Sequence, residues 1–518
     1  MKQTSLLSIT GVLLAVNTVH AVEKNENKNL LKKINKRPNI VIIEADDLMY
    51  RFTGKLGEGF IESPNLDYLA TNGVYFSNAV CQGVMCGPSR NSLITGLYPH
   101  NIGFYRNGQM GPLPDGVWNI GAAMKQSGYN TAWVGKCHIH PPKNGKRRQS
   151  SSDGLKAMGF NYAIASLGRA MLASIIRNDK KFNKYKNDVY FEYLKKKGVF
   201  ETYVNDCKTS KSVTSLSEDD YLDGFYTNTA NKWIENNKEK IPFFLWLNFS
   251  CPHGPHDAPQ KYHDIYKDKK IPAPKSIDFG GVQIPDPLLV DSKHCTVERS
   301  KALRKAYAAN CTFVDAMVGK VINQLKKDNL IENTIIIFFS DHGIFMGNHG
   351  RIHKGTVFNE ITSPSLLIYY PKEFKKGFIE KKPVELLSVL KTMLDVANAS
   401  EKDKNTPYGE SLMPLLTGKG EYKTKYVFAE IAGAQMCFDG RYRYYRTQNG
   451  VLLYDIQEDE FEMKNIAPKN PEIIERMNKA VNDWFKRTGD PLPVNYLRNN
   501  DNIKNFKRKI YFNQKDTI

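Results

Sequence analysis

The chain has 518 residues, of which 41% are hydrophobic, 25% charged and 11% aromatic. This composition is that of a globular protein long enough for two domains, and it excludes a disordered chain, a collagen-like chain and a small disulfide-rich scaffold. The 73 Lys and Arg residues exceed the 54 acidic residues, for a formal net charge of +19. Such a charge favours acidic ligands such as nucleic acid, anionic lipid or sulfated sugar, or reflects only a lysine-rich solvated surface.

Residues 1–21 have the pattern of a secretory signal peptide. Lys2 precedes an apolar run over residues 6–16, and Val19 and Ala21 suit cleavage by a signal peptidase. The run is too short to cross a bilayer, and no later segment approaches the roughly 20 apolar residues of a membrane helix. No Cys follows the run to take a lipid. We therefore predict an exported protein, periplasmic or secreted, without a membrane span.

Four nearly continuous apolar runs predict strands that are buried on both faces of a parallel sheet. They lie at residues 39–45, 131–134, 242–249 and 334–339. Helical patterns between them include residues 226–237 and 301–326. The alternation of strands and helices predicts an α/β fold, with a central, mostly parallel sheet that carries helices on both faces.

The pattern changes near residue 417. Short alternating runs at 427–431, 441–446 and 451–454 are separated by the hairpin-turn pairs Asp439-Gly440 and Asn449-Gly450. A helix then begins at Pro471, with an apolar stripe of Ile473, Ile474, Met477, Val481, Trp484 and Phe485. We predict a larger domain over residues 37–416 and a smaller C-terminal α+β domain with an antiparallel sheet over 417–518.

Eight cysteines are scattered along the chain without C-x-x-C pairs or zinc-finger spacing. Neither a disulfide framework nor a structural zinc site is indicated, although the pattern leaves room for one or two bridges.

Polar side chains follow all four predicted strands at their carboxyl ends, where open α/β sheets bind ligands. They are Asp46, Asp47, Lys136, His138, His253, Asp341 and His342. A single Asp in such a place is usually a helix cap or a turn residue. Four coincident strand ends instead predict one functional site.

Three carboxylates and one imidazole at one point would repel each other without a cation among them. Carboxylate oxygens favour Ca²⁺ or Mg²⁺, and the single His leaves Zn²⁺ or Mn²⁺ open. We expect Ca²⁺ first. The alternative is that Asp46 and Asp47 only cap a helix.

Cys86 stands just before Pro88 and Arg90 at the start of a predicted helix. The free N–H groups of a helix N-terminus attract anions, so Cys86 would face an oxyanion. An unmodified thiol there could be a nucleophile of low pKa. However, the spacing Cys-x₃-Arg is too tight for the Cys-x₅-Arg loop of thiol phosphatases, and a buried structural cysteine is the alternative.

Residues 86–96 resemble the C-x-P-S-R…TG signature of the type I, formylglycine-dependent sulfatases, in the alkaline-phosphatase-like superfamily. Other motifs of that family follow in the expected order, at residues 37–47, 135–138, 252–255, 340–343, 349–354 and 453–465. Two segments depart from the family pattern. Residues 142–220 match no motif, and residues 384–397 lack the usual Asp-x-x-Pro.

The resemblance implies an alkaline-phosphatase-like sheet and hydrolysis of sulfate esters. A separate maturation enzyme would oxidise Cys86 to formylglycine, whose hydrated form would be the nucleophile. One metal ion per chain, Ca²⁺ first with Mg²⁺ or Mn²⁺ as alternatives, would be held by Asp46, Asp47, Asp341, His342 and residue 86.

The family also implies roles for the cationic residues. Arg90, Lys136 and Lys354 would neutralise the sulfate oxygens. His253 would protonate the leaving alkoxide, while His138 would hold the hydrated aldehyde and take the proton that expels sulfate.

Basic charge and export favour a sulfated saccharide as substrate, and we expect no nucleic-acid partner. Contacts to the sugar are predicted at Arg106, Asn107, His140, His256 and Arg351. One alternative is a phosphonate monoester hydrolase or phosphodiesterase of the same fold. Another is a non-catalytic glycan-binding relative, which Cys86 and the complete set of metal and cation positions argue against.

Overall fold

The computed structural model describes residues 37–107, 113, 116–139, 152–178, 182–183, 185–239, 242–276, 293–447 and 450–489. The predicted signal peptide and His140 lie outside these ranges. Within them, none of the helices has the length and apolar character needed to cross a membrane.

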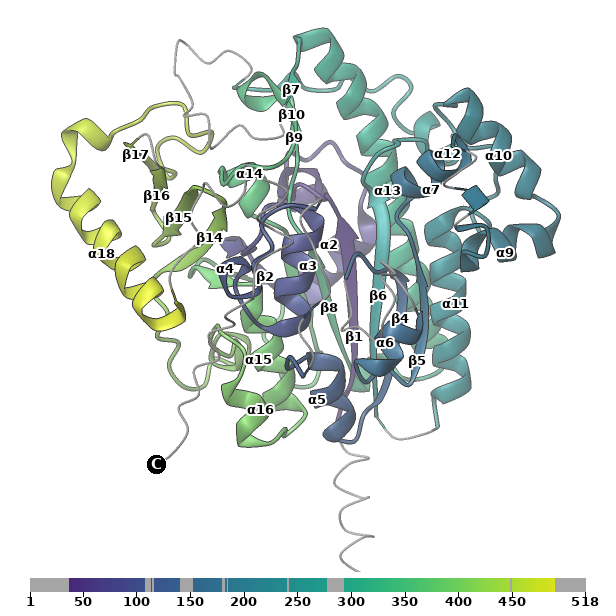
Figure 1. The fold of residues 1–518 in the computed structure, drawn as a ribbon, viewed down its shortest axis with the longest axis horizontal. Coiled ribbons are helices and arrows are strands. Elements are labelled where there is room, and N and C mark those ends of the chain that lie inside the picture. Colours follow the sequence, from purple (N-terminus) through teal and green to yellow (C-terminus); the bar gives the residue numbers. More distant parts are fainter. Residues whose placement is uncertain are drawn as a thin grey trace, which may run out of the picture.

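An eight-stranded sheet forms the centre of the molecule, in the order β12-β2-β11-β8-β1-β6-β4-β5 (Figure 1). Its strands are β1 (Asn39–Asp46), β2 (Val74–Phe76), β4 (Asn130–Lys136), β5 (Tyr162–Ser166), β6 (Phe243–Pro252), β8 (Thr334–Ser340), β11 (Leu366–Tyr369) and β12 (Phe378–Glu380). Every neighbouring pair is parallel except the two pairs that β11 makes with β2 and β8. The predicted mostly parallel sheet is therefore confirmed.

The four predicted strands are the four adjacent central strands β8, β1, β6 and β4. They carry continuous apolar runs because helices cover both of their faces. The outer strands β2, β5, β11 and β12 were not predicted. They have three to five residues, and β12 leaves Phe378 and Ile379 exposed.

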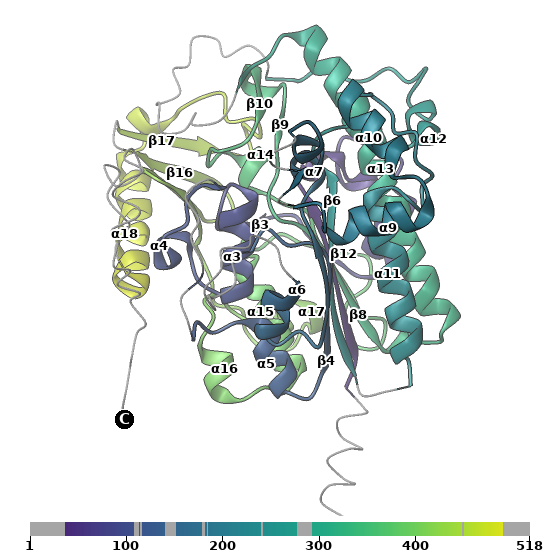
Figure 2. The same cartoon turned by 45° about the vertical axis from the view of Figure 1, so that its right-hand side comes forward.

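Two helix layers cover the sheet, as Figure 2 shows. Ile40 and Ile42 of β1 pack into the core of one layer, which contains α3 (Cys86–Thr95), α5 (Ile120–Gln126) and α15 (Leu387–Val396). Val41 and Ile43 pack into the core of the other, which contains α2 (Pro64–Asn72), α11 (Leu222–Asn237) and α13 (Val297–Lys327). This arrangement follows from the two-residue period of a strand, which sends successive side chains to opposite faces.

The segment without family motifs adds helices beside the edge strand β5. They are α6 (Ser152–Ala157), α7 (Arg169–Ile176), α9 (Val189–Lys197) and α10 (Phe200–Thr209). Shorter elements elsewhere are β3 (Ala79–Val80), α4 (Pro99–Ile102), α12 (Gln260–Asp264), β7 (Lys293–His294), β9 (Phe345–Met346), β10 (Arg351–His353), α14 (Asn359–Thr362), β13 (Val384–Glu385), α16 (Glu401–Asn405) and α17 (Met413–Thr417).

The C-terminal part is a four-stranded antiparallel meander followed by the helix α18 (Pro471–Thr488). The strands are β14 (Val427–Ile431), β15 (Ala434–Phe438), β16 (Tyr442–Thr447) and β17 (Gly450–Asp455). The pair Asp439-Gly440 lies between β15 and β16, as expected of a hairpin turn, although β15 itself was not predicted. The antiparallel sheet is confirmed, and the exact boundary at residue 417 stays a prediction.

All eight cysteines lie within the described residues, and each is a buried free thiol. The structure therefore contains no disulfide bridge among them.

Trp484 packs α18 against the meander, and we predict that its replacement by Ala strongly destabilises the protein. The indole is 2% exposed, and it stacks on Phe428 with ring centroids 4.6 Å apart. Trp484→Ala should lower the free energy of unfolding by about 3–5 kcal/mol, the usual cost of removing a buried Trp. Chemical denaturation measures this. Ile379→Ala, at a half-exposed position, is the control with an expected change within about 0.5 kcal/mol. Equal changes for the two variants would contradict the prediction.

Candidate active site

The predicted acidic cluster forms at the carboxyl ends of β1 and β8. These strands pair in parallel, with Ala45 opposite Ser340, so that the residues that follow reach the same level. The Asp341 N–H donates to Ala45 O at 3.1 Å. One oxygen of Asp341 then accepts from the Asp47 N–H at 3.1 Å and the His342 N–H at 2.9 Å. Asp47 has a φ of 67°, a conformation that non-glycine residues rarely adopt outside over-determined sites.

Cys86 is the first residue of α3, and its side chain points into the acidic cluster. The thiol is 1% exposed, and Sγ lies 3.1 Å from Asp46 Oδ1 and 3.8 Å from Asp47 Oδ1. The side-chain oxygen of Asn107 accepts from the Gly87 N–H at 2.9 Å and so fixes the first turn of α3. The helix therefore holds Cys86 at the strand ends with its N-terminal dipole directed at the same place.

Three cationic side chains surround Cys86. Lys354 Nζ lies 2.9 Å from Sγ and also contacts Asp47. Lys136 contacts the second oxygen of Asp46, and Arg90 Nε donates to Asp341 Oδ2 at 3.0 Å. Arg90 Nη2 is buried without a hydrogen-bond acceptor in the described part of the chain. This guanidinium N–H can bind an oxygen of a bound anion.

Arg90 is held by Glu44 and Asn248, two residues that no sequence motif indicated. Glu44 Oε1 lies 3.0 Å from Arg90 Nη1, and Asn248 Oδ1 accepts from the same nitrogen at 3.1 Å. The Trp246 indole donates to Glu44 at 2.7 Å. Burial raises the pKa of Glu44 to about 7, against the opposing effect of Arg90. The signal available in the sequence was one carboxylate inside an otherwise apolar strand.

Two more histidines, both half-buried, lie near the cluster. The His253 side chain is 28% exposed, with Nε2 3.6 Å from Asp47 Oδ2, and its backbone N–H donates to Asp46 O at 2.9 Å. His138 lies two residues beyond Lys136 with a φ of 46°, and its carbonyl accepts from Asn91. His253 therefore lies where the cluster opens to solvent.

The charges of the site determine its protonation. Burial acts to raise the pKa of Asp46, but Lys136, His253 and Arg90 together hold it well below its ordinary value. The pKa of Asp47 is lowered to about 2 in the same way, chiefly by Lys354 against burial. Burial and the adjacent Asp46 raise the pKa of the Cys86 thiol far above its usual range. Asp46 and Asp47 are thus ionised near neutral pH, while the unmodified thiol is protonated and a weak nucleophile.

The donor set fits a divalent cation. One ligand atom from each of Asp46, Cys86, Asp341 and His342 lies within 4.8 Å of the others, and Asp47, Cys86 and His253 form a second such group. His342 Nδ1 lies 2.8 Å from Gly343 O, so that Nε2 faces Asp47 and Asp341 at 3.4 and 3.8 Å. With its proton on Nδ1, the imidazole presents a lone pair to the carboxylates, as a metal ligand does.

The residues predicted to contact a sugar are placed as follows. Asn107 binds the backbone of α3, with Arg106 beside it in sequence. His256 is held by Pro252 O at 3.1 Å and packs edge-on against Tyr307. Burial and Arg169 lower the pKa of His256 to about 3. Arg351 begins β10, opposite His294 of β7. With His140 outside the described residues, all five substrate contacts stay predictions.

The chain is similar in sequence to sulfatases along most of its length. The sulfatase family model matches residues 38–399, and a model described as N-sulphoglucosamine sulphohydrolase, C-terminal, matches residues 347–487. An arylsulfatase of Clostridium perfringens is 27% identical over 466 residues, which cover 85% of this chain and 92% of that protein. An ulvan-active sulfatase of Formosa agariphila is 29% identical over 472 residues, 88% of this chain and 82% of that protein.

The fold is also that of a solved phosphonate monoester hydrolase from Silicibacter pomeroyi. The two superpose with a TM-score of 0.73 at 23% identity, over 88% of this chain and 96% of that one.

Proposed function

The chain belongs to the sulfatase family, and on this premise we propose that it removes sulfate from sulfated carbohydrates, with formylglycine at position 86 and a divalent cation at Asp46, Asp47, Asp341 and His342. That it is a sulfuric ester hydrolase follows from the family and its named relatives. The modification, the metal and the sugar are the proposed parts. Ca²⁺ is the first candidate for the metal, because three of the four side chains offer carboxylate oxygens.

The observation that carries the proposal is the position of Cys86. It is the first residue of α3, it is buried, and it touches both carboxylates of the β1 end and the ammonium of Lys354. An unmodified thiol in this place is held protonated by burial and by Asp46. Oxidised and hydrated, residue 86 would supply a hydroxyl that ionises more readily than that of Ser, and a bound divalent cation would lower its pKa further.

The chain's own cations account for recognition of the sulfate group. Arg90 of α3, Lys136 of β4 and Lys354, which follows β10, approach Cys86 or its carboxylate neighbours. In the transition state the charge of the transferring group is spread over its three equatorial oxygens, and donors fixed in advance stabilise that arrangement without reorganising. Glu44 and Asn248 orient Arg90 for this contact.

His253 and His138 are the groups proposed to transfer protons. His253 faces solvent at the mouth of the cluster, where the alcohol part of a substrate would lie, and is placed to protonate the leaving oxygen. His138 follows Lys136 and is proposed to hold the hydrated residue 86 and to take its proton when sulfate leaves.

A carbohydrate substrate is supported by three observations. The net charge of +19 suits an anionic partner. The C-terminal family model names a sulfated amino sugar, and one relative is named for its activity on ulvan.

The proposal also includes export to the periplasm or the medium, and maturation by a separate formylglycine-generating enzyme.

The second candidate is a phosphonate monoester hydrolase, which the structural likeness favours. Comparing kcat/KM for 4-nitrophenyl sulfate with that for a 4-nitrophenyl phosphonate monoester distinguishes the two. The proposed function expects the higher value for the sulfate, and release of sulfate from defined sulfated mono- and disaccharides. A higher value for the phosphonate would replace it by the second candidate.

We predict that His253→Ala affects substrates according to their leaving group. A sugar alkoxide needs a proton as it leaves, whereas 4-nitrophenolate leaves readily without one. The kcat on a sulfated sugar should fall by about 10²–10⁴, the usual contribution of a general acid, and the kcat on 4-nitrophenyl sulfate should fall much less. His263→Ala is the control, since this half-buried histidine lies on α12, outside the proposed site. Equal losses on both substrates for His253→Ala would assign His253 another role.

A further inference from the structure

A groove of about 410 Å³ lies along the outer edge of the central sheet, between β5, α9 and α11. β5 is the last strand of the sheet, and Figure 1 places these three elements on the right-hand side of the molecule. The groove is lined by the aromatic rings of Tyr162, Tyr193, Phe225 and Trp233 and by the ammonium groups of Lys196 and Lys232. None of these residues takes part in the proposed active site.

The aromatic rings are fixed before any ligand binds. Tyr162 stacks on Trp233 with centroids 6.3 Å apart, and Tyr193 packs on Phe225 at 4.5 Å. The Tyr193 hydroxyl also donates to Asp220 at 2.6 Å. Phe225 and Trp233 are buried, whereas Tyr162 and Tyr193 stay partly exposed. Rigid, partly exposed aromatic rings bind a flat apolar face at low cost in conformational entropy.

The groove also carries positive charge that nearby carboxylates do not neutralise. Lys196 and Lys232 are exposed, and no ion pair joins either one to the described part of the chain. Their neighbour Lys195, in contrast, pairs with Glu192 at 3.1 Å. Glu192 is the single carboxylate among the described lining residues, so the groove keeps two positive charges available to an anionic ligand.

The edge strand connects the groove to the active site. β5 ends at Ser166, and the chain continues to Gly168, where an added Cβ would lie 3.2 Å from Lys136 Cε. Ile164 lines the groove and lies four residues before Gly168, a path of about 13 Å in extended chain. A ligand that follows β5 for a few sugar units would thus approach Lys136.

We propose that this groove binds a sulfated saccharide chain, with the aromatic rings against the sugar faces and Lys196 and Lys232 against its sulfate groups. The inference rests on the proposed carbohydrate substrate. Because binding requires no turnover, the two can be tested apart.

The test measures binding by the Cys86→Ala protein, which is not expected to turn over the polymer. Its mobility is compared in native gels that contain ι-carrageenan, ulvan or heparin, with agarose as the unsulfated matrix. Lys196→Gln/Lys232→Gln should weaken the affinity for the retarding polymer about fivefold to tenfold, as expected for the loss of two exposed charge contacts. The retardation should also fall with added salt.

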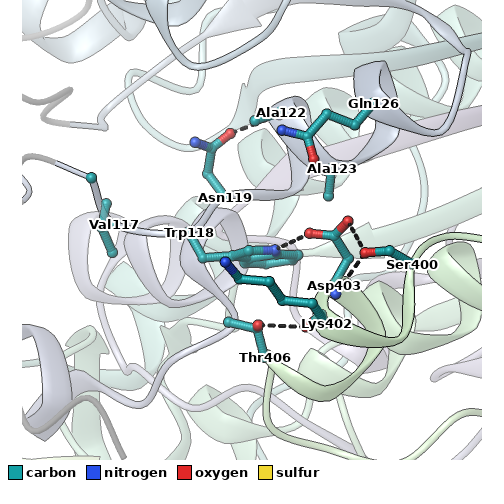
Figure 3. Close-up of a pocket in the computed structure, with 11 residues that line it drawn as sticks. Val117, Trp118, Asn119, Ala122, Ala123, Gln126, Ser400, Lys402, Asp403 and Thr406 are labelled. Carbon is teal, nitrogen blue, oxygen red and sulfur yellow. Dashed lines mark hydrogen bonds between the residues drawn. The ribbon is translucent and has the colours of Figure 1, made fainter. Parts of the chain in front are cut away.

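A second cavity supplies a charge-matched control. It has about 480 Å³ and lies between α5 and α16, and Figure 3 shows that the Trp118 indole there points to Asp403. Its single lining cation among the described residues is Lys402, and Lys125 lies nearby on α5. Lys125→Gln/Lys402→Gln removes the same charge from another surface and should leave the retardation almost unchanged.

The inference would be overturned if both double variants weakened the affinity for the polymer equally, or if neither weakened it. It would also be overturned if the groove variant changed only self-association, because the occupant would then be a second copy of the chain. With Cys86 intact, Lys196→Gln/Lys232→Gln should raise KM on the polymer and leave kcat/KM on 4-nitrophenyl sulfate unchanged. Retardation by sulfated polymers without turnover of any sulfate ester would instead contradict the proposed function and support the groove.

Discussion

Replacing Cys86 with Ala is expected to lower kcat on 4-nitrophenyl sulfate by at least about 10³, because the covalent route depends on an activated group at this position. The side chain is small and buried at the start of α3. The substitution therefore removes the nucleophile with little change in packing, and thermal denaturation should show a folded protein.

The same position tests the proposed modification. Peptide mass spectrometry of protein made together with a formylglycine-generating enzyme should find aldehyde in place of the thiol at residue 86, and the specific activity should follow the modified fraction. Cys437→Ala is the matched control, since Cys437 is also a buried thiol but lies in the small C-terminal sheet. Full turnover by protein that carries only the unmodified thiol would refute the mechanism.

Asp341→Asn is expected to remove the bound metal and to lower kcat by about 10³ or more, since a metal that activates the nucleophile supplies several kcal/mol. Asp341 is fully buried and bonds to Arg90 Nε, Asp47 N and His342 N. The neutral Asn side chain is a weaker metal ligand than the carboxylate of Asp341. It also removes one of the carboxylates that pair with the guanidinium of Arg90.

Metal analysis and reconstitution provide the measurement. Wild-type protein should contain about one divalent cation per chain, lose activity to a chelator and recover it best with Ca²⁺ rather than with Mg²⁺ or Mn²⁺. Asp403→Asn is the control, because this buried carboxylate binds Trp118 and Ser400 far from the strand ends in sequence and structure. A fully active Asp341→Asn enzyme, or a fully active wild-type enzyme without metal, would exclude the proposed site.

The sequence determined the central strands and the composition of the site. The runs that became β1, β4, β6 and β8 are continuous because both of their faces are buried, and this burial is a local property that can be read from residue type alone. The polar residues after them converge because parallel strands end at one edge of a sheet. The sequence alone therefore groups Asp46, Asp47, Asp341 and His342.

Other features depended on contacts between segments far apart in the chain. Glu44 appears in the sequence as one polar residue in a buried strand, and only the approach of Arg90 from α3 and Trp246 from β6 gives it a function. The contact of Asn107 with a sugar stays a prediction, and only the fold shows that its side-chain oxygen accepts from the Gly87 N–H. The short outer strands and β15 lack an extended pattern, because pairing with neighbours stabilises them more than their own composition does.

The groove beside β5 likewise depends on contacts between segments that are far apart in the chain. Tyr162, Tyr193 and Lys232 come from three elements separated by tens of residues, and no pattern in the sequence groups them. Residue type and the positions where buried strands end are encoded locally, and they indicate which polar groups gather at the edge of the sheet. The partners of each side chain, and the shape of the surface they form, depend on how helices and loops pack around the sheet, and that packing is decided by the tertiary structure alone.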